Sequence, residues 1–263
     1  MDPFPTRYSG LSNTEVNELY RSETWDGLNR DERLDALQEL ENRSAESLGN
    51  RPCEVRLEQM ENATYGCYDD GVIYVNEGLV ENGELNVNFE DGTTMQYTPD
   101  DTNAQLMDTI HHENYHAYQD EVVNGRLEHS NQAEAELWRA NEENYIRGCD
   151  NESLYRIQSV ERSAFDYGET QTTAAFEEIE AKYGADDGFQ AYQENISNDY
   201  ENALTTAQTQ YRDENVQENL DNHMLANYSG TQADDYAADT SQISHEASTD
   251  SDTSYSNDMA DGL

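Results

Sequence analysis

The 263-residue chain contains almost no lysine and little basic charge of any kind. Its 14 basic residues, with Lys182 the only lysine, stand against 57 acidic residues, and the formal net charge is −43. Because the basic residues form no patch, we expect no nucleic-acid partner. The acids are spread along the whole chain, which favours a protein of a high-salt cytoplasm, where counterions screen the self-repulsion. An acidic structural or viral interaction protein is the alternative.

Cysteine pairs and long hydrophobic runs are also missing. Cys53, Cys67 and Cys149 are an odd number without a C-x-x-C motif, which excludes a disulfide framework and a thiolate zinc site. No stretch approaches 18 apolar residues, so we expect no membrane span. The start of the chain, MDPFPTRYSG, lacks the basic and apolar regions of a signal peptide. We therefore expect a cytoplasmic protein, with non-classical export left open.

The segment from Leu106 to Asp120 contains the motif H-E-x-x-H, formed by His112, Glu113 and His116. On a helix, side chains four residues apart lie on one face. Two imidazoles at this spacing can bind one Zn²⁺, and the glutamate between them can act on a zinc-bound water. The motif therefore predicts a zinc site.

The surrounding residues favour the helix that this motif needs. Thr98 is a suitable N-cap, Pro99 suits the first helical position, and Asp101 follows as a weak capping box. Apolar residues recur at helical spacing at Leu106, Ile110 and Ala117.

The rest of the chain predicts an α+β fold, with a small antiparallel sheet over about residues 53–97 before a mostly helical core. Two turns, Asp70-Gly71 and Asp91-Gly92, each lie between short β-prone runs and predict hairpins. Residues 229–263 carry eight acids and no lysine or arginine, which predicts a disordered acidic tail. The expected organisation is a lead-in (1–30), a metal-binding domain (31–185), a helical extension (186–228) and the tail (229–263).

A catalytic zinc needs a third protein ligand, and the motif supplies only two. Val122 occupies the position where a third histidine would follow, so the histidine-type continuation fails. His129 is a weak candidate in a loop. Two later glutamates are better placed, Glu136 and Glu161. Glu161 is favoured because it lies at the edge of an apolar helix face, where a carboxylate is costly unless it is paired or binds metal.

Four segments together resemble zincin-like, gluzincin-type metallopeptidase domains of bacterial toxin-like and effector-like proteins. They are ERLDALQELEN (32–42), GCYDDGVIYVN (66–76), TIHHENYHAYQ (109–119) and YRIQSVERSAF (155–165). The resemblance implies that His112, His116 and Glu161 bind the zinc and that Glu113 is the general base. It implies supporting roles for Gln119 and Gln158.

The implied activity is hydrolysis of peptide bonds in a peptide or protein substrate, by a zinc-activated water with Glu113 as base. Tyr115, Tyr167 and Arg162 are candidates for the oxyanion donor. A zincin-like scaffold that binds peptides without cleaving them is the main alternative. A second is an acidic interaction protein in which the motif occurs by chance.

The charge balance generates a prediction about salt. With a net charge of −43 on a folded chain, we expect a cooperative thermal transition at molar KCl that is lost on dilution, because the repulsion is then unscreened. Circular dichroism melts over a KCl series measure this. An unfolding temperature that does not change between low and molar salt would contradict the high-salt interpretation.

Overall fold

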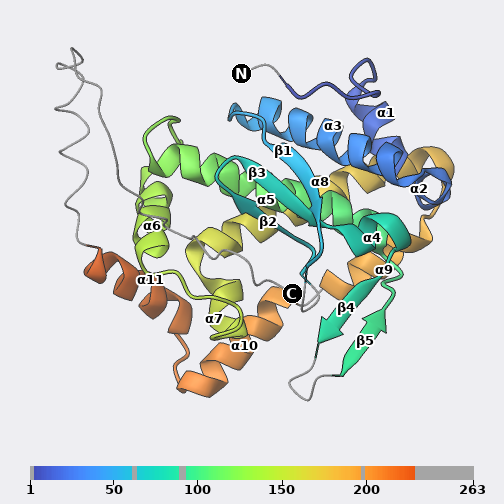
Figure 1. Ribbon diagram of the computed structural model, residues 1–263. Coiled ribbons are helices and arrows are strands. Elements are labelled where there is room, and N and C mark those ends of the chain that lie inside the picture. Colours follow the sequence, from blue (N-terminus) through green and yellow to red (C-terminus); the bar gives the residue numbers. More distant parts are fainter. Residues whose placement is uncertain (1–2, 61–63, 89–92, 197–198, 229–263) are drawn as a thin grey trace, which may run out of the picture.

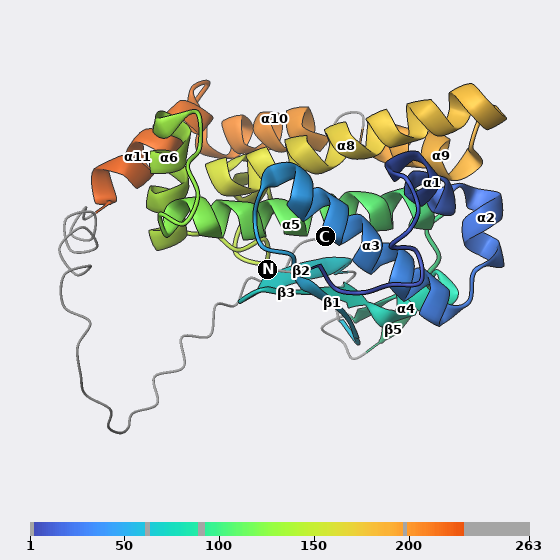
Figure 2. The ribbon, with the colours of Figure 1, turned by 90° about the horizontal axis from the view of Figure 1, so that it is seen from above.

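A long helix, α5 (Thr102–Val123), forms the centre of the protein in the computed structural model, which describes residues 3–60, 64–88, 93–196 and 199–228. α5 lies between a small sheet and a second long helix, α8 (Ser159–Tyr183) (Figures 1 and 2). Helix α3 (Arg30–Leu48) packs beside both α5 and the sheet. The predicted α+β class, small sheets followed by a mostly helical core, is confirmed.

The N-terminal segment forms short elements that lead into α3. They are α1 (Asn13–Asn17), the 3₁₀-helix η1 (Glu18–Tyr20) and α2 (Ser22–Gly27). Ser12 caps α1, as predicted, and Asn29 caps α3 through a capping box with Glu32. Leu37, Leu40 and Ala45 of α3 are buried, as the amphipathic pattern indicates.

The sheet differs from the predicted single antiparallel sheet over residues 53–97. Its three strands, β1 (Glu54–Glu58), β2 (Gly66–Asp69) and β3 (Val72–Asn76), have the order β1-β3-β2. β2 and β3 form the predicted hairpin at Asp70-Gly71, but β1 runs parallel to β3. Alternating residues reveal a strand without giving its direction. Here α3 sets the start of β1, because the Gln38 and Glu41 side chains accept the N–H groups of Val55 and Cys53.

Two further strands form a separate hairpin. β4 (Leu85–Asn88) and β5 (Thr94–Tyr97) pair antiparallel with each other alone. The predicted turn at Asp91-Gly92 lies outside the described residues. A short helix that the sequence reasoning missed, α4 (Glu77–Asn82), comes between the two sheets and is capped by Asn76.

The start of α5 also differs from its prediction. The helix begins at Thr102 with Asp101 as N-cap, so Thr98 and Pro99 lie before it, and Asp101 makes no capping hydrogen bond. Asp101 instead accepts a hydrogen bond from Asn195 Nδ2 at 2.8 Å. A tertiary contact with a later helix therefore outweighs the local capping signal.

The helices after α5 are α6 (Gln132–Glu143), α7 (Glu152–Ile157) and α8. Asn151 caps α7, as predicted. The sequence predicts one helix over about 153–169 and another over 172–183, but the only interruption in this region of the structure falls at Gln158. The Gln158 side chain bonds both backbone groups of Ile146 and the Asn141 amide, which holds Gln158 in an extended conformation.

Three helices complete the described chain: α9 (Asp187–Ile196), α10 (Asp199–Tyr211) and α11 (Val216–Asn227). The sequence predicts one or two surface helices over about 188–224, yet the described residues form three, and Phe189 and Tyr192 of α9 belong to the main hydrophobic core. The division of the chain at residue 185 stays a prediction. The expected disordered tail, 229–263, lies outside the described residues.

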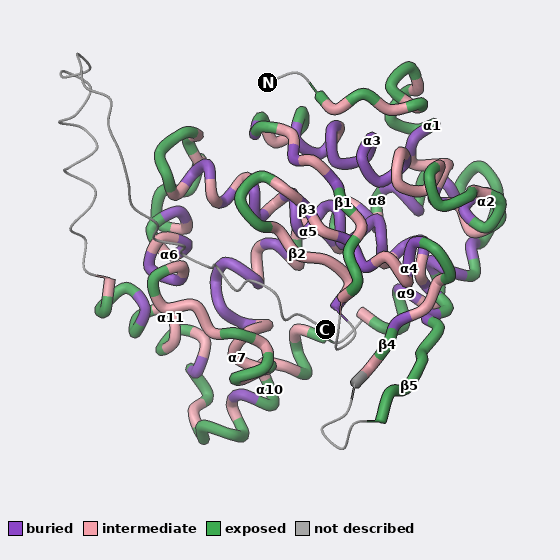
Figure 3. Tube along the Cα trace, viewed as in Figure 1, coloured by how far each residue is buried: buried purple, intermediate pink, exposed green. Residues whose placement is uncertain are grey.

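Two glycines allow neighbouring elements to approach α5 closely, and α5 is buried along most of its length (Figure 3). A Cβ on Gly66 in β2 would lie 2.6 Å from Thr109 Cγ2 and 2.9 Å from the Tyr74 carbonyl oxygen. A Cβ on Gly168 in α8 would lie 2.4 Å from Asp108 Oδ1 and 3.1 Å from the Asp108 carbonyl oxygen. No side chain fits at either position without movement of its neighbours.

The close contact at Gly66 predicts a loss of stability on substitution. Gly66→Ala forces β2 away from α5, and we expect the free energy of unfolding to fall by about 1–3 kcal/mol. Denaturant unfolding in molar KCl measures this. Gly27→Ala is the matched control, because its Cβ would meet nothing within 4 Å. Equal stability of the two variants would show that the strand yields without cost.

Candidate metal centre

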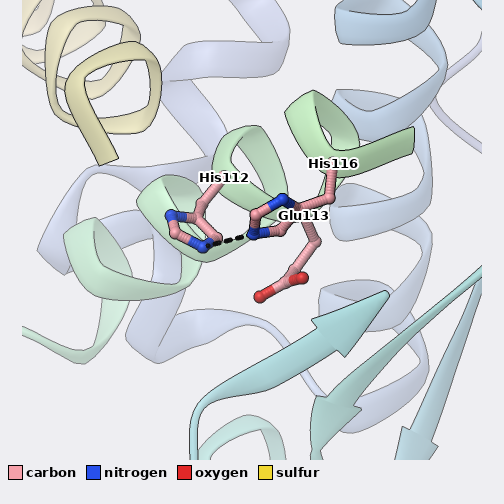
Figure 4. A group of neighbouring side chains, drawn as sticks. All are labelled: His112, Glu113 and His116. Atoms are coloured by element: carbon pink, nitrogen blue, oxygen red, sulfur yellow. Dashed lines mark hydrogen bonds between the residues drawn. The ribbon is translucent and has the colours of Figure 1, made fainter. Parts of the chain in front are cut away.

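The three motif residues lie together on buried turns of α5. His112, Glu113 and His116 are each 7% exposed, and their potential ligand atoms all lie within 4.8 Å of one another. Figure 4 shows the two imidazoles edge to face, with a dashed line joining them. The two Nε2 atoms are 3.0 Å apart. The helix thus brings two ring nitrogens to a single point, as the i, i+4 spacing predicts.

Gln119 orients the ring of His116. Gln119 Oε1 lies 2.8 Å from His116 Nδ1, while its amide nitrogen donates to the Val160 carbonyl and Ser163 Oγ of α8. Since the amide nitrogen is used in this way, the oxygen accepts the Nδ1 proton. The Nε2 lone pair of His116 then faces His112 and is available to a metal. The supporting role implied for Gln119 fits this geometry.

Glu161 brings a carboxylate from α8 to the same point. Its Oε2 lies 3.4 Å from His112 Nε2, and its Oε1 lies 3.5 Å from His116 Nε2. The Tyr145 hydroxyl donates to Oε1 at 2.7 Å. Oε2 is buried and accepts no hydrogen bond from the described residues. Glu161 is 1% exposed, so its charge depends on these few neighbours.

The Glu113 side chain extends toward the strand side of α5 (Figure 4), and its carboxylate lies within 4.8 Å of the histidine ligand atoms. Gly66 of β2 lies against its side chain, because a Cβ there would be 3.7 Å from Glu113 Cγ. Burial raises the pKa of the Glu113 carboxyl above its ordinary value, against the opposing effect of His112 and His116. The cluster therefore holds two buried carboxylates, one from α5 and one from α8.

The buried charges are strongly coupled. Burial alone would lower the pKa of His116, but the Glu161 carboxylate raises it to about 9. Burial would likewise raise the pKa of Glu161, yet the charge of His116 and the closeness of both imidazoles hold it well below its usual range. This cluster therefore requires a positive charge at its centre. A proton supplies one, and a divalent cation fits the same donors.

Helix α3 supports the opposite face of the motif. Asn114 donates to Glu41 Oε1 at 2.9 Å, and Ser44 Oγ lies 3.2 Å from His111 Nδ1. Burial raises the pKa of Glu41 to about 8 and lowers that of His111 to about 4. The sequence reasoning assigned α3 only a role in covering the core, so these polar contacts are an addition.

The centre opens into two adjoining cavities. The smaller, of about 50 Å³, is bordered by all four site residues, His112, Glu113, His116 and Glu161. A larger cavity of about 870 Å³ lies next to it. The residues that border both are Tyr65, Gln105, Asp108, Tyr155 and Phe165. A substrate held in the large cavity would therefore reach the histidine pair.

The structure separates the other sequence candidates from this centre. His129 bonds Tyr118 and Glu134, and Glu136 is exposed on α6. The expected oxyanion donors do not border the small cavity: Tyr115 stacks on Tyr167, and Arg162 bonds the Ile157 carbonyl. Gln158 ties down Ile146, and through it the segment that carries Tyr145.

Two tyrosines were missed by the sequence reasoning. Tyr145 and Tyr155 border the small cavity, and both hydroxyls face Glu161. Tyr145 lies in the connection between α6 and α7, and Tyr155 lies on α7. Neither belongs to a periodic pattern of its own, so only the fold places them here.

Comparison of the chain with protein-family models, with curated proteins and with solved structures gives no match. The finding that stands is therefore a buried His112-Glu113-His116 group on a helix that could hold a metal ion. In addition, none of the helices in the described ranges is long and apolar enough to cross a membrane.

Proposed function

We propose that this protein is a zinc-dependent metallopeptidase that hydrolyses peptide bonds. The observation that carries the proposal is the convergence of His112 and His116 Nε2 at 3.0 Å, with the Glu161 carboxylate 3.4–3.5 Å from both. Two imidazoles and one carboxylate are a donor set typical of catalytic zinc. The zincin-like resemblance of the four segments agrees with it.

In this proposal His112, His116 and Glu161 hold the ion. The donors fit it, since the Gln119 contact leaves the His116 Nε2 lone pair free and Glu161 Oε2 is a buried acceptor without a hydrogen bond from the described residues. Glu161 is preferred to Glu113 as the third ligand because its oxygens lie 3.4 and 3.5 Å from the two Nε2 atoms, and because the sequence motif gives Glu113 the role of base. When bound, Zn²⁺ would supply a Lewis acid that polarises the peptide carbonyl and acidifies water.

Glu113 moves the protons of the reaction. Its carboxylate takes a proton from the attacking water and delivers it to the leaving amine. The raised pKa of Glu113 suits this exchange, since a carboxylate with a pKa nearer neutrality is a stronger base and a readier donor afterwards. Glu113 borders the small cavity, and its carboxylate lies within 4.8 Å of the histidine ligand atoms, close enough to act on a water held there.

Tyr155 is the proposed donor to the developing oxyanion. Burial and the nearby Glu161 carboxylate raise its pKa well above the ordinary value, so its hydroxyl stays protonated. The hydroxyls of Tyr145 and Tyr155 both face Glu161, but of the two only Tyr155 borders both cavities. A preorganised hydroxyl in a water-poor site stabilises negative charge strongly. Tyr155 therefore replaces Tyr115, Tyr167 and Arg162 in this role.

Metal stoichiometry tests the ligand assignment. In molar KCl, we expect about one zinc per chain for the parent and for Glu113→Gln, and a loss of zinc in His116→Ala, because two remaining donors hold the ion poorly. Glu161→Gln should weaken binding strongly. Glu136→Gln is the matched control and should leave it unchanged, since Glu136 is exposed on α6. Loss of zinc in Glu136→Gln, with retention in Glu161→Gln, would overturn the assignment.

Turnover tests the peptidase itself. We expect Glu113→Gln to lower kcat on a peptide substrate by about a hundredfold or more while zinc is retained, the range for loss of a general base. Tyr155→Phe should lower kcat with little change in KM. Peptide cleavage followed by mass spectrometry measures both. A Glu113→Gln variant as active as the parent would favour a non-catalytic scaffold.

A further inference from the structure

The large cavity beside the metal centre is lined by an excess of carboxylates. Among the described residues that border its 870 Å³, Arg156 is the only basic one. The acidic residues on its wall are Asp101, Asp108, Glu152, Glu169 and Asp199. Its apolar lining includes aromatic side chains such as Tyr65, Tyr97 and Phe165. Such a cavity combines apolar surface with carboxyl groups, which suits a side chain with an aliphatic stem and a cationic end.

The one basic group is already engaged. Arg156 Nη2 donates to Glu169 Oε1 at 2.6 Å, and its guanidinium lies 3.4 Å from the centroid of the Phe165 ring. Arg156 therefore pairs with Glu169, and its charge also opposes the effect of burial on Asp108, whose pKa is raised to about 8. Among the described residues, no ion pair joins Asp101 to a basic side chain.

Asp101 is a buried residue of this wall whose carboxylate is incompletely hydrogen-bonded. It is 2% exposed, and its Oδ1 has no hydrogen-bond partner in the described part of the chain. Its other oxygen accepts from Asn195. Although Asp101 occupies the N-cap of α5, its side chain makes no capping bond. A buried carboxylate oxygen without a partner is costly in free energy, and here it belongs to a residue that lines the cavity.

Asp101 lies at the start of the helix that carries the two histidines, so helical geometry gives the distance between Asp101 and His112. Asp101, Gln105, Asp108 and His112 follow one another at helical spacing, and the first three line the large cavity while the last belongs to the histidine pair. Eleven residues at 1.5 Å per residue place Asp101 about 16 Å from His112 along the helix. An extended peptide covers about 3.3–3.6 Å per residue, and a long side chain spans part of that distance.

We infer that this cavity binds a lysine or arginine side chain of the peptide substrate, with Asp101 as its partner. The basic residue lies about two to four positions from the bond that is cut, given the 16 Å offset and the reach of the side chain. This inference rests on the proposed peptidase function and names its substrate class. The buried, charge-assisted contact would give selectivity that molar salt screens only weakly.

A binding experiment tests the cavity independently of turnover. The probe is a fluorescent peptide with one arginine, compared with the same peptide carrying citrulline, an uncharged isostere. Binding to the zinc-loaded Glu113→Gln protein is followed by anisotropy in molar KCl. We expect the arginine peptide to bind about tenfold or more tightly, the range for a hydrogen bond to a charged group. Equal affinities would overturn the inference, whatever variants follow.

Two neighbouring substitutions then locate the contact. Asp101→Asn keeps the shape of the side chain and should reduce the arginine preference to about twofold or less. Asp100→Asn changes the charge equally at an exposed residue one position away and should retain the preference. An unchanged preference in Asp101→Asn, with the fold verified by circular dichroism, would exclude Asp101 as the partner.

Cleavage of a peptide library by the parent protein separates this inference from the proposed function. We expect an excess of lysine and arginine two to four positions from the cut. Cleavage without that excess would overturn the substrate class and leave the peptidase proposal standing. No cleavage, together with a retained arginine preference in binding, would support the cavity and overturn the peptidase proposal.

Discussion

The structure depends on the burial of charged and polar groups at the middle of its central helix. Two imidazoles and two carboxylates are withdrawn from water between α8 and the sheet. Withdrawal of an ionised group costs several kcal/mol unless other charges and hydrogen bonds compensate it. Here the compensation is mutual, since the Glu161 carboxylate raises the pKa of His116 and the charge of His116 lowers the pKa of Glu161. A cation at their meeting point would satisfy all of them.

The neighbouring elements contribute to the hydrophobic core, and they also hold the buried polar groups of α5 in position. α8 supplies Glu161 and the two acceptors that fix Gln119. The segment before α7 supplies the Tyr145 hydroxyl, and Gln158 holds that segment in place. α3 supports the other face of α5, where Asn114 of α5 donates a hydrogen bond to Glu41 of α3. Such support matters chemically, because metal ligands act only when their rings and carboxylates are held in the productive orientation.

Helix α5 and the shared face of His112 and His116 could be predicted from the sequence, because both follow local rules. Periodic apolar residues predict the helix, and four-residue spacing predicts a shared face. Glu161 was reached by a weaker argument, a carboxylate on an apolar face, aided by the resemblance. The sequence assigns Tyr155 no role and Asp101 only a capping one, since contacts with distant helices give both residues their positions. The parallel pairing of β1 and the start of α5 at Thr102 depend on the same kind of contact.

Gly168 shows how a packing detail can become a chemical one. Its missing Cβ lets α8 approach the backbone of α5 at Asp108, seven residues, or about two helical turns, beyond Glu161. In the proposed metal site the same two helices carry the three donors, the histidines on one and the carboxylate on the other. The distance between the helices would then also set the distance between the ligands. A hydrogen atom in place of a methyl group at Gly168 would thus help to select the ionic radius, although it lies away from the ion.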